Sequence, residues 1–145
     1  GAIFAKVGLE RLDLLNENSY SVLEWMIPAP GQGIIGIASM KKNEKIAGII
    51  KKLNCKETML CAEIERSFLK TIQAGCSAPV GAYAYIKNKK IHFKTAIFST
   101  EGKEAIFHEV EIPLDKAKGL GEKLAFQVLK KGGSKLMEKI KNQMR

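Results

Sequence analysis

Cys76 has the clearest capacity for covalent chemistry in this sequence. It lies in the small-residue segment 73–81, between Gly75 and Ser77, where little side-chain bulk would shield its thiol. The thiolate is the nucleophilic form of cysteine, and exposure near positive charge favours that form. Spacing alone leaves two interpretations open: Cys76 is either a nucleophile or a small residue tolerated in a tight turn.

Two further places could contact a ligand. Residues 30–33 have the sequence Pro-Gly-Gln-Gly, and glycine allows a ligand to approach the backbone closely. Arg11 carries a guanidinium, whose paired N–H groups suit a carboxylate. Neither signal is specific, because a Gly-Gln-Gly segment also occurs in ordinary loops and a single arginine on a short helix is commonly solvated.

The spacing of histidines and cysteines argues against other kinds of site. Neither His92 nor His108 has a cysteine at the spacing of a nucleophile–base pair, so a cysteine protease is not indicated. The three cysteines form no Cys-x-x-Cys pair, and we expect no metal site. Unpaired cysteines without a secretory leader are typical of a reducing compartment, so we expect a cytoplasmic protein. No apolar run approaches the roughly 20 residues of a membrane span, so we expect no membrane partner.

The charge balance favours an anionic partner only weakly. Lys and Arg number 24 against 15 Asp and Glu, which gives a net charge of +9 and a pI near 9.5. Much of the excess lies in residues 116–145, on the polar side of predicted helices, where a solvated surface is the usual interpretation. Nucleic-acid recognition uses arginines and stacking aromatic residues, and both are few here. We therefore expect no nucleic-acid partner, and a basic α+β module that binds RNA or another anionic surface is the alternative.

The helix that would lead into Cys76 is predicted over residues 54–72. Asn54 is the expected N-cap, with Glu57 three residues later. Its apolar side chains recur every four residues along one face: Leu60, Ile64, Phe68 and Ile72. Glu63 and Glu65 are expected to point away from this face.

Three strands and two helices are predicted after the loop. The strands span residues 82–87, 91–98 and 104–112, joined by short polar turns. An amphipathic helix is expected over residues 115–131, and Ser134 would cap a final helix. Residues 54–145 are thus expected to form an α-βββ-α-α unit, an α+β domain whose three-stranded antiparallel sheet is covered by helices.

Residues 1–53 have no partners within the chain for their predicted strands. Residues 1–5 and 34–38 are apolar strand candidates, and the second suits the middle of a sheet covered on both faces. Helices are expected within residues 6–15 and over residues 44–53. Strands without partners in the chain indicate a fragment, and we expect missing sequence upstream.

Five short motifs occur in order along the chain. They are Gly-Leu-Glu-Arg-Leu at residues 8–12, Ala-Pro-Gly-Gln-Gly at 29–33, Leu-Asn with Glu-Thr at 53–58, Ala-Glu with Arg at 62–66, and Gly-Cys with Pro-Val-Gly at 75–81. In order and spacing the chain resembles the porphobilinogen deaminase (hydroxymethylbilane synthase) family, as its C-terminal portion. One departure is Ala74, where the family commonly has glycine.

The resemblance implies a transferase of tetrapyrrole and haem biosynthesis. Enzymes of this family join four porphobilinogen molecules head to tail into hydroxymethylbilane and release ammonia. They build on a dipyrromethane cofactor, a primer held by a thioether to one cysteine, and Cys76 matches that cysteine. Loss of ammonia from porphobilinogen leaves an electrophilic methylene that a soft sulfur nucleophile captures, which accounts for the residue type.

Two more residues match cofactor-binding positions of the family. Arg11 matches an arginine that binds the acetate and propionate groups of cofactor and substrate, and Gln32 matches a glutamine close to the bound pyrroles. The family's catalytic aspartate would lie upstream of Gly1, so we expect no catalytic residue in this chain and no activity from it alone. Its partner would be the missing N-terminal half of the same protein, which we expect to be a monomer when complete.

The resemblance also divides the chain into three parts. Residues 1–25 correspond to the end of the family's second domain, and residues 26–53 to the segment that returns to the first domain. The resemblance thus implies that these residues are segments of two α/β domains that are mostly absent from this chain. Residues 54–145 correspond to the C-terminal, third domain, which carries the cofactor cysteine.

Overall fold

The computed structural model of the chain describes residues 1–15, 20–75 and 78–143. At its centre is an antiparallel sheet in the order β1-β2-β3, formed by Val80–Lys87, Lys90–Phe98 and Ala105–Pro113. Asn88 and Lys89 connect the first two strands with φ angles of 52° and 58°, the left-handed values that suit a two-residue hairpin. The predicted meander is confirmed.

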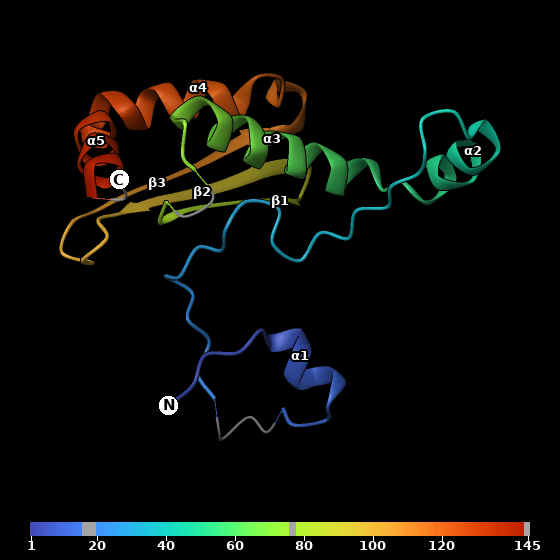
Figure 1. Ribbon diagram of the computed structural model, residues 1–145, viewed down its shortest axis with the longest axis horizontal. Helices are drawn as coiled ribbons and strands as arrows, with labels where there is room; N and C mark the ends of the chain where they lie inside the picture. Colours follow the sequence, from blue (N-terminus) through green and yellow to red (C-terminus); the bar gives the residue numbers. More distant parts are fainter. Residues whose placement is uncertain (16–19, 76–77, 144–145) are drawn as a thin grey trace.

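Three helices cover one face of the sheet (Figure 1). The helix α3 (Lys56–Ile72) packs against β1 and against α4 (Leu120–Val128), and α5 (Ser134–Gln143) completes the layer. The predicted two-layer α+β architecture, with helices on a three-stranded antiparallel sheet, is therefore confirmed.

The core lies between these helices and the inner face of the sheet. At its centre Phe68 of α3 meets Phe93 of β2 edge to face, with ring centroids 5.5 Å apart and planes at 83°. Both side chains are completely buried. The other large side chains with less than 2% exposure are Ile91, Ile97, Ile140, Val128 and Thr95. Burial of such apolar area supplies most of the stability of the domain.

Two glycines divide the C-terminal helical region, and the first of them changes where the predicted helix starts. The sequence predicts a helix that starts at residue 115, but α4 starts later, at Leu120. The reason is Gly119, which adopts a left-handed φ of 69° directly before the helix. The preceding residues Leu114–Lys116 form a short 3-10 turn instead. Gly132, with φ of 108°, lies in the turn Leu129–Gly133 that separates α4 from α5. Both positions favour glycine because side chains with a Cβ avoid positive φ.

Both predicted helix caps are wrong. Asn54 ends α2 (Glu44–Leu53) rather than starting α3, and its side-chain Nδ2 donates to the Met59 sulfur at 3.5 Å. Cys55 takes the N-cap position of α3 without a side-chain capping bond. Ser134 already belongs to α5, and its hydroxyl donates to the Leu129 carbonyl at 3.2 Å.

Residues 1–53 form no layer of this domain. Their helices α1 (Lys6–Arg11) and α2 lie away from the sheet, below it and to its right in Figure 1, within the ranges that the sequence predicts. The strands predicted over residues 1–5 and 34–38 are wrong, because both segments lack regular secondary structure. A strand needs a neighbour for its backbone N–H and C=O groups, and in the described ranges neither segment pairs with one.

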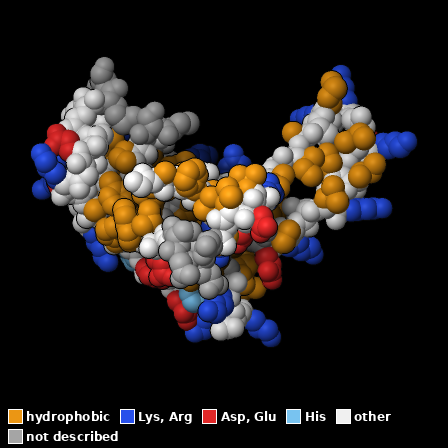
Figure 2. Space-filling view, turned by 90° about the horizontal axis from the view of Figure 1, so that it is seen from below, with side chains coloured by type: hydrophobic (Ala, Val, Ile, Leu, Met, Phe, Trp, Pro, Cys, Tyr) orange, Lys and Arg blue, Asp and Glu red, His pale blue; other side chains and the backbone are white. Residues whose placement is uncertain are grey.

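Many apolar side chains of residues 1–53 are exposed, as Figure 2 shows for the lobe formed by α2. The largest exposed fractions belong to Ile35 (85%), Met40 (80%), Ile3 (70%), Leu12 (68%), Phe4 (67%) and Leu53 (66%). Such a concentration of exposed apolar side chains is unusual for the surface of a monomeric domain.

Candidate functional site

The Pro-Gly-Gln-Gly segment folds into two overlapping turns. The Gln32 N–H donates to the Ala29 carbonyl at 3.1 Å, and the Ile34 N–H donates to the Gly31 carbonyl at 3.2 Å. Gly31 and Gly33 have φ angles of 75° and 80°, which lie in the left-handed region that glycine occupies without strain. The turn geometry therefore favours glycine on both sides of Gln32.

Glu65 connects this turn to the domain. Its side chain is 3% exposed. One carboxylate oxygen accepts the Gly31 N–H at 2.7 Å, and the other accepts the Ala84 N–H of β1 at 2.8 Å. The expectation that Glu65 points away from the apolar face of α3 is wrong, because it is buried beside Ile64 and Phe68.

The residues before the turn follow the free edge of β1. The Ala82 N–H of that strand donates to the Pro28 carbonyl at 2.9 Å. A Cβ at Gly81 would lie 2.5 Å from the Ile27 carbonyl oxygen, which is too close for any side chain. Glycine at this position thus allows the backbone of the segment to lie directly against the strand.

A cavity of about 220 Å³ opens between this segment, β1 and the first turns of α3. Its lining residues are Gln32, Ile34, Glu57, Thr58, Cys61, Glu65, Tyr83, Ala84, Tyr85 and Ile86. The predicted ligand-binding residue Gln32 therefore borders a cavity. Two of the lining residues are carboxylates, so electrostatics favours a neutral or cationic guest over an anionic one.

The two described cysteines differ in chemical state. Burial raises the pKa of the Cys61 thiol, and the nearby Glu65 and Glu57 carboxylates raise it further. Cys55 is exposed at the start of α3, and a hydrogen bond with the Thr58 side chain lowers its pKa. Cys55 is thus a surface residue rather than a packing residue, whereas Cys61 belongs to the core.

These environments predict different alkylation rates. In a Cys76→Ser background, near neutral pH, Cys55 is expected to react with iodoacetamide roughly ten times faster than Cys61, because a lower pKa gives more thiolate and exposure gives access. Peptide mass spectrometry over time would measure both rates. Thr58→Val should slow Cys55 alone, and equal rates at the two cysteines would contradict the described geometry.

Cys76 lies outside the described residues, but both ends of its loop are described. Gln73 ends α3 with a left-handed φ of 57°, and its side-chain carbonyl accepts Lys141 Nζ of α5 at 3.3 Å. After the loop, the Pro79 carbonyl accepts the Phe98 N–H at 3.0 Å. A Cβ at Gly75 would meet no atom within 4 Å. The loop therefore starts and ends on fixed elements.

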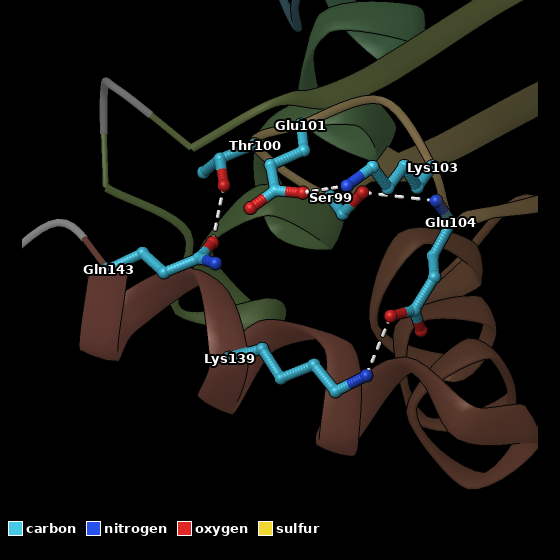
Figure 3. Close-up of polar contacts among 7 residues, drawn as sticks. All are labelled: Ser99, Thr100, Glu101, Lys103, Glu104, Lys139 and Gln143. Atoms are coloured by element: carbon cyan, nitrogen blue, oxygen red, sulfur yellow. Dashed lines mark hydrogen bonds and ion pairs between the residues drawn. The ribbon is translucent and has the colours of Figure 1, made fainter.

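The helix α5 also holds the hairpin that joins β2 to β3 (Figure 3). The Thr100 hydroxyl donates to Gln143 Oε1, and Lys139 Nζ lies 2.6 Å from Glu104 Oε1. Within the hairpin, Ser99 Oγ accepts the Glu104 N–H at 3.0 Å. These contacts are exposed and individually weak. Together with the Lys141 contact they place α5 against both the hairpin and the start of the Cys76 loop.

The outer face of the sheet carries aromatic and charged side chains. Tyr85 and His92 stack with centroids 4.8 Å apart. Lys90 pairs with Glu111, and this contact lowers the pKa of the Glu111 carboxyl. Lys94 pairs with Glu109 at 3.3 Å in the same way. Carboxylates of β3 therefore offset the charge of these two lysines on this face.

Arg11 is the predicted residue that the structure does not bring to the site. It ends α1 and is exposed. None of the ion pairs among the described residues involves Arg11. In Figure 1, α1 stands apart from the Pro-Gly-Gln-Gly turn. Any joint action of Arg11 and Gln32 on a ligand therefore requires a different arrangement of residues 1–26.

Comparison with protein families distinguishes the resemblance to porphobilinogen deaminase from the alternative of a basic anion-binding module. A model of the porphobilinogen deaminase C-terminal domain matches residues 59–130. A second model, described as the porphobilinogen deaminase dipyrromethane cofactor-binding domain, matches residues 1–48. The chain belongs to the porphobilinogen deaminase family. The predicted resemblance is confirmed, and the two matched ranges contain the positions of Arg11, Gln32 and Cys76.

Individual porphobilinogen deaminases give the same result. The protein of Limosilactobacillus reuteri is 36% identical over 134 residues, which cover 90% of this chain and 43% of that protein. That of Alkaliphilus metalliredigens is 31% identical over 141 residues, covering 97% and 45%. That of Chloroherpeton thalassium is 39% identical over 106 residues, covering 72% and 33%. The chain thus spans less than half the length of these relatives.

The described residues also bear on membrane insertion and metal binding. None of the helices in these ranges combines the length and apolar character that a bilayer crossing requires. No group of three His, Cys, Asp or Glu side chains in the same ranges is arranged to hold a metal ion.

Proposed function

We propose that this chain is the C-terminal portion of a hydroxymethylbilane synthase, which joins four porphobilinogen molecules head to tail and releases ammonia. The observation that carries the proposal is the match of both family models in chain order, over residues 1–48 and 59–130. The division of the chain at residues 1–25, 26–53 and 54–145 is part of the proposal, as are a cytoplasmic location and a monomeric complete protein.

Cys76 is the proposed attachment point of the dipyrromethane cofactor. In the attachment reaction a C–S bond forms and the C–N bond of the aminomethyl group breaks. The thiol proton leaves with the amine as ammonia, so atoms and charge balance. When bound, the cofactor supplies the pyrrole end on which the chain grows.

The cavity beside Gln32 does not suit this group, whereas the residue types around Cys76 do. The sequence neighbours of Cys76 at positions 75 and 77 are glycine and serine, which add little bulk beside an attached group. The cavity beside Gln32 contains Glu57 and Glu65, whose charges disfavour a ligand rich in carboxylates. We therefore propose that Gln32 contacts pyrroles from the turn itself rather than from inside the cavity. Arg11 would supply a cation for the acetate and propionate groups.

The test compares the 145-residue chain with a full-length protein that contains it. The full-length protein is expected to consume porphobilinogen and produce a tetrapyrrole that absorbs visible light after oxidation. The 145-residue chain alone is expected to produce none, because the proposed proton-transferring aspartate lies outside it. Turnover by the 145 residues alone would refute this division of roles, and inactivity of the loaded full-length protein would refute the proposed function.

A further inference from the structure

We infer that Glu65 is a positioning residue that fastens the Pro-Gly-Gln-Gly turn, and with it Gln32, to the C-terminal domain. The inference rests on the proposed function, because Gln32 matters only if the turn contacts the pyrroles. What it adds is a residue of α3 that touches no reacting atom and still determines where the turn lies.

The burial of Glu65 is the first observation that requires an explanation. At 3% exposure it is the one charged side chain among the described residues that is buried. Burying a carboxylate costs free energy unless hydrogen bonds or an opposite charge compensate it. None of the ion pairs in the described ranges involves Glu65. Its compensation in these ranges comes from the N–H groups of Gly31 and Ala84.

The two N–H groups belong to parts of the chain that are otherwise separate. Ala84 lies in the middle of β1, inside the folded domain, whereas Gly31 lies in a segment without regular secondary structure. One rigid carboxylate therefore joins a fixed element to a segment with few other attachments. Hydrogen bonds to a charged acceptor are stronger than neutral ones, so this contact is the strongest polar attachment of the turn.

The second attachment lies three residues earlier. The Pro28 carbonyl accepts the Ala82 N–H, and the close approach of Ile27 depends on the missing side chain at Gly81. Both attachments hold the same segment against the same edge of β1. If Glu65 positions the turn, disturbing Gly81 should release it as well, by a different physical route.

Glu65→Gln is the direct test, with Glu63→Gln as its control on the exposed side of the same helix. A glutamine keeps one acceptor oxygen but presents an NH₂ group to the second N–H, so only one of the two bonds can persist. Because Ala84 is fixed in β1, the Gly31 bond is the one expected to break. Gly81→Ala is the second variant, since its Cβ cannot fit beside the Ile27 carbonyl.

Amide hydrogen exchange of the 145-residue chain gives the first readout. In Glu65→Gln the protection of the Gly31 amide should fall about tenfold, while Phe93 in β2 keeps its protection. Gly81→Ala should lower protection at Gly31 and Ala82, and Glu63→Gln should change neither. Unchanged protection at Gly31, or an equal loss throughout the sheet, would overturn the inference.

Kinetics of the full-length protein give the second readout. Loss of one charge-assisted hydrogen bond should raise KM for porphobilinogen about tenfold in Glu65→Gln, with a smaller change in kcat per loaded enzyme. A merely structural role would lower the amount of loaded enzyme and leave KM unchanged, which would overturn the inference. A wild-type protein without turnover would refute the proposed function instead, and the exchange experiment would still report on the contact.

Discussion

Cys76→Ser in the full-length protein is expected to abolish covalent attachment of the dipyrromethane cofactor and to reduce tetrapyrrole formation to background. A serine hydroxyl stays protonated near neutral pH and is a far weaker nucleophile than a thiolate, so it does not capture the electrophilic methylene. Intact-protein mass spectrometry would measure the attachment, and porphobilinogen consumption would measure the activity.

Two other substitutions are the matched controls for this result. Cys55→Ser and Cys61→Ser should both leave the cofactor attached, because Cys55 is a surface residue and Cys61 is a protonated core thiol. Cys61→Ser should lower stability, since it places a hydroxyl in an apolar core. A cofactor that remains attached to the Cys76→Ser protein would rule out the assignment of Cys76.

Phe68→Ala is expected to cost about 3–5 kcal/mol of unfolding free energy, the largest stability effect that we predict for a single residue. Phe68 is completely buried and packs edge to face on Phe93. Truncation would remove this contact and leave a cavity between α3 and β2. Urea unfolding of the 145-residue chain, followed by circular dichroism, would measure the loss.

The matched control is Phe126→Ala on α4, whose side chain is 52% exposed. Truncating this exposed ring should change the unfolding free energy by about 0.5 kcal/mol or less. Equal effects of the two substitutions would contradict the placement of the core between α3 and the sheet.

The elements set by local patterns were predictable from the sequence. Apolar residues at every fourth position and a terminating small-residue loop gave the end of α3 at Ile72 correctly, and alternating residues with polar turns located β1, β2 and β3. The bounds of α2 were also predicted correctly, because Ile46, Ile49, Ile50 and Leu53 recur on one side of the helix.

The elements that depend on distant partners were not predictable. The apolar run at residues 34–38 has the composition of a central strand, yet without neighbouring strands it forms none here. The start of α4 was missed for a local reason, because a glycine within an amphipathic pattern does not reveal from sequence whether it adopts a positive φ.

The candidate site was predicted only in part. The Pro-Gly-Gln-Gly segment and the loop around Cys76 stood out by composition, but the role of Glu65 was missed. One signal could have indicated it: Glu65 follows Cys61 by four residues and precedes Phe68 by three, which places it on the buried face of α3. Its partners are backbone N–H groups of two distant segments, and such contacts leave no pattern in a sequence.

The central claim is that this chain carries the cofactor of a porphobilinogen deaminase on Cys76. Its most direct test is mass spectrometry of the peptide that contains Cys76, taken from the full-length protein expressed in cells that make porphobilinogen. The account predicts a dipyrromethane adduct on this residue. An unmodified Cys76 in folded, full-length protein would contradict it.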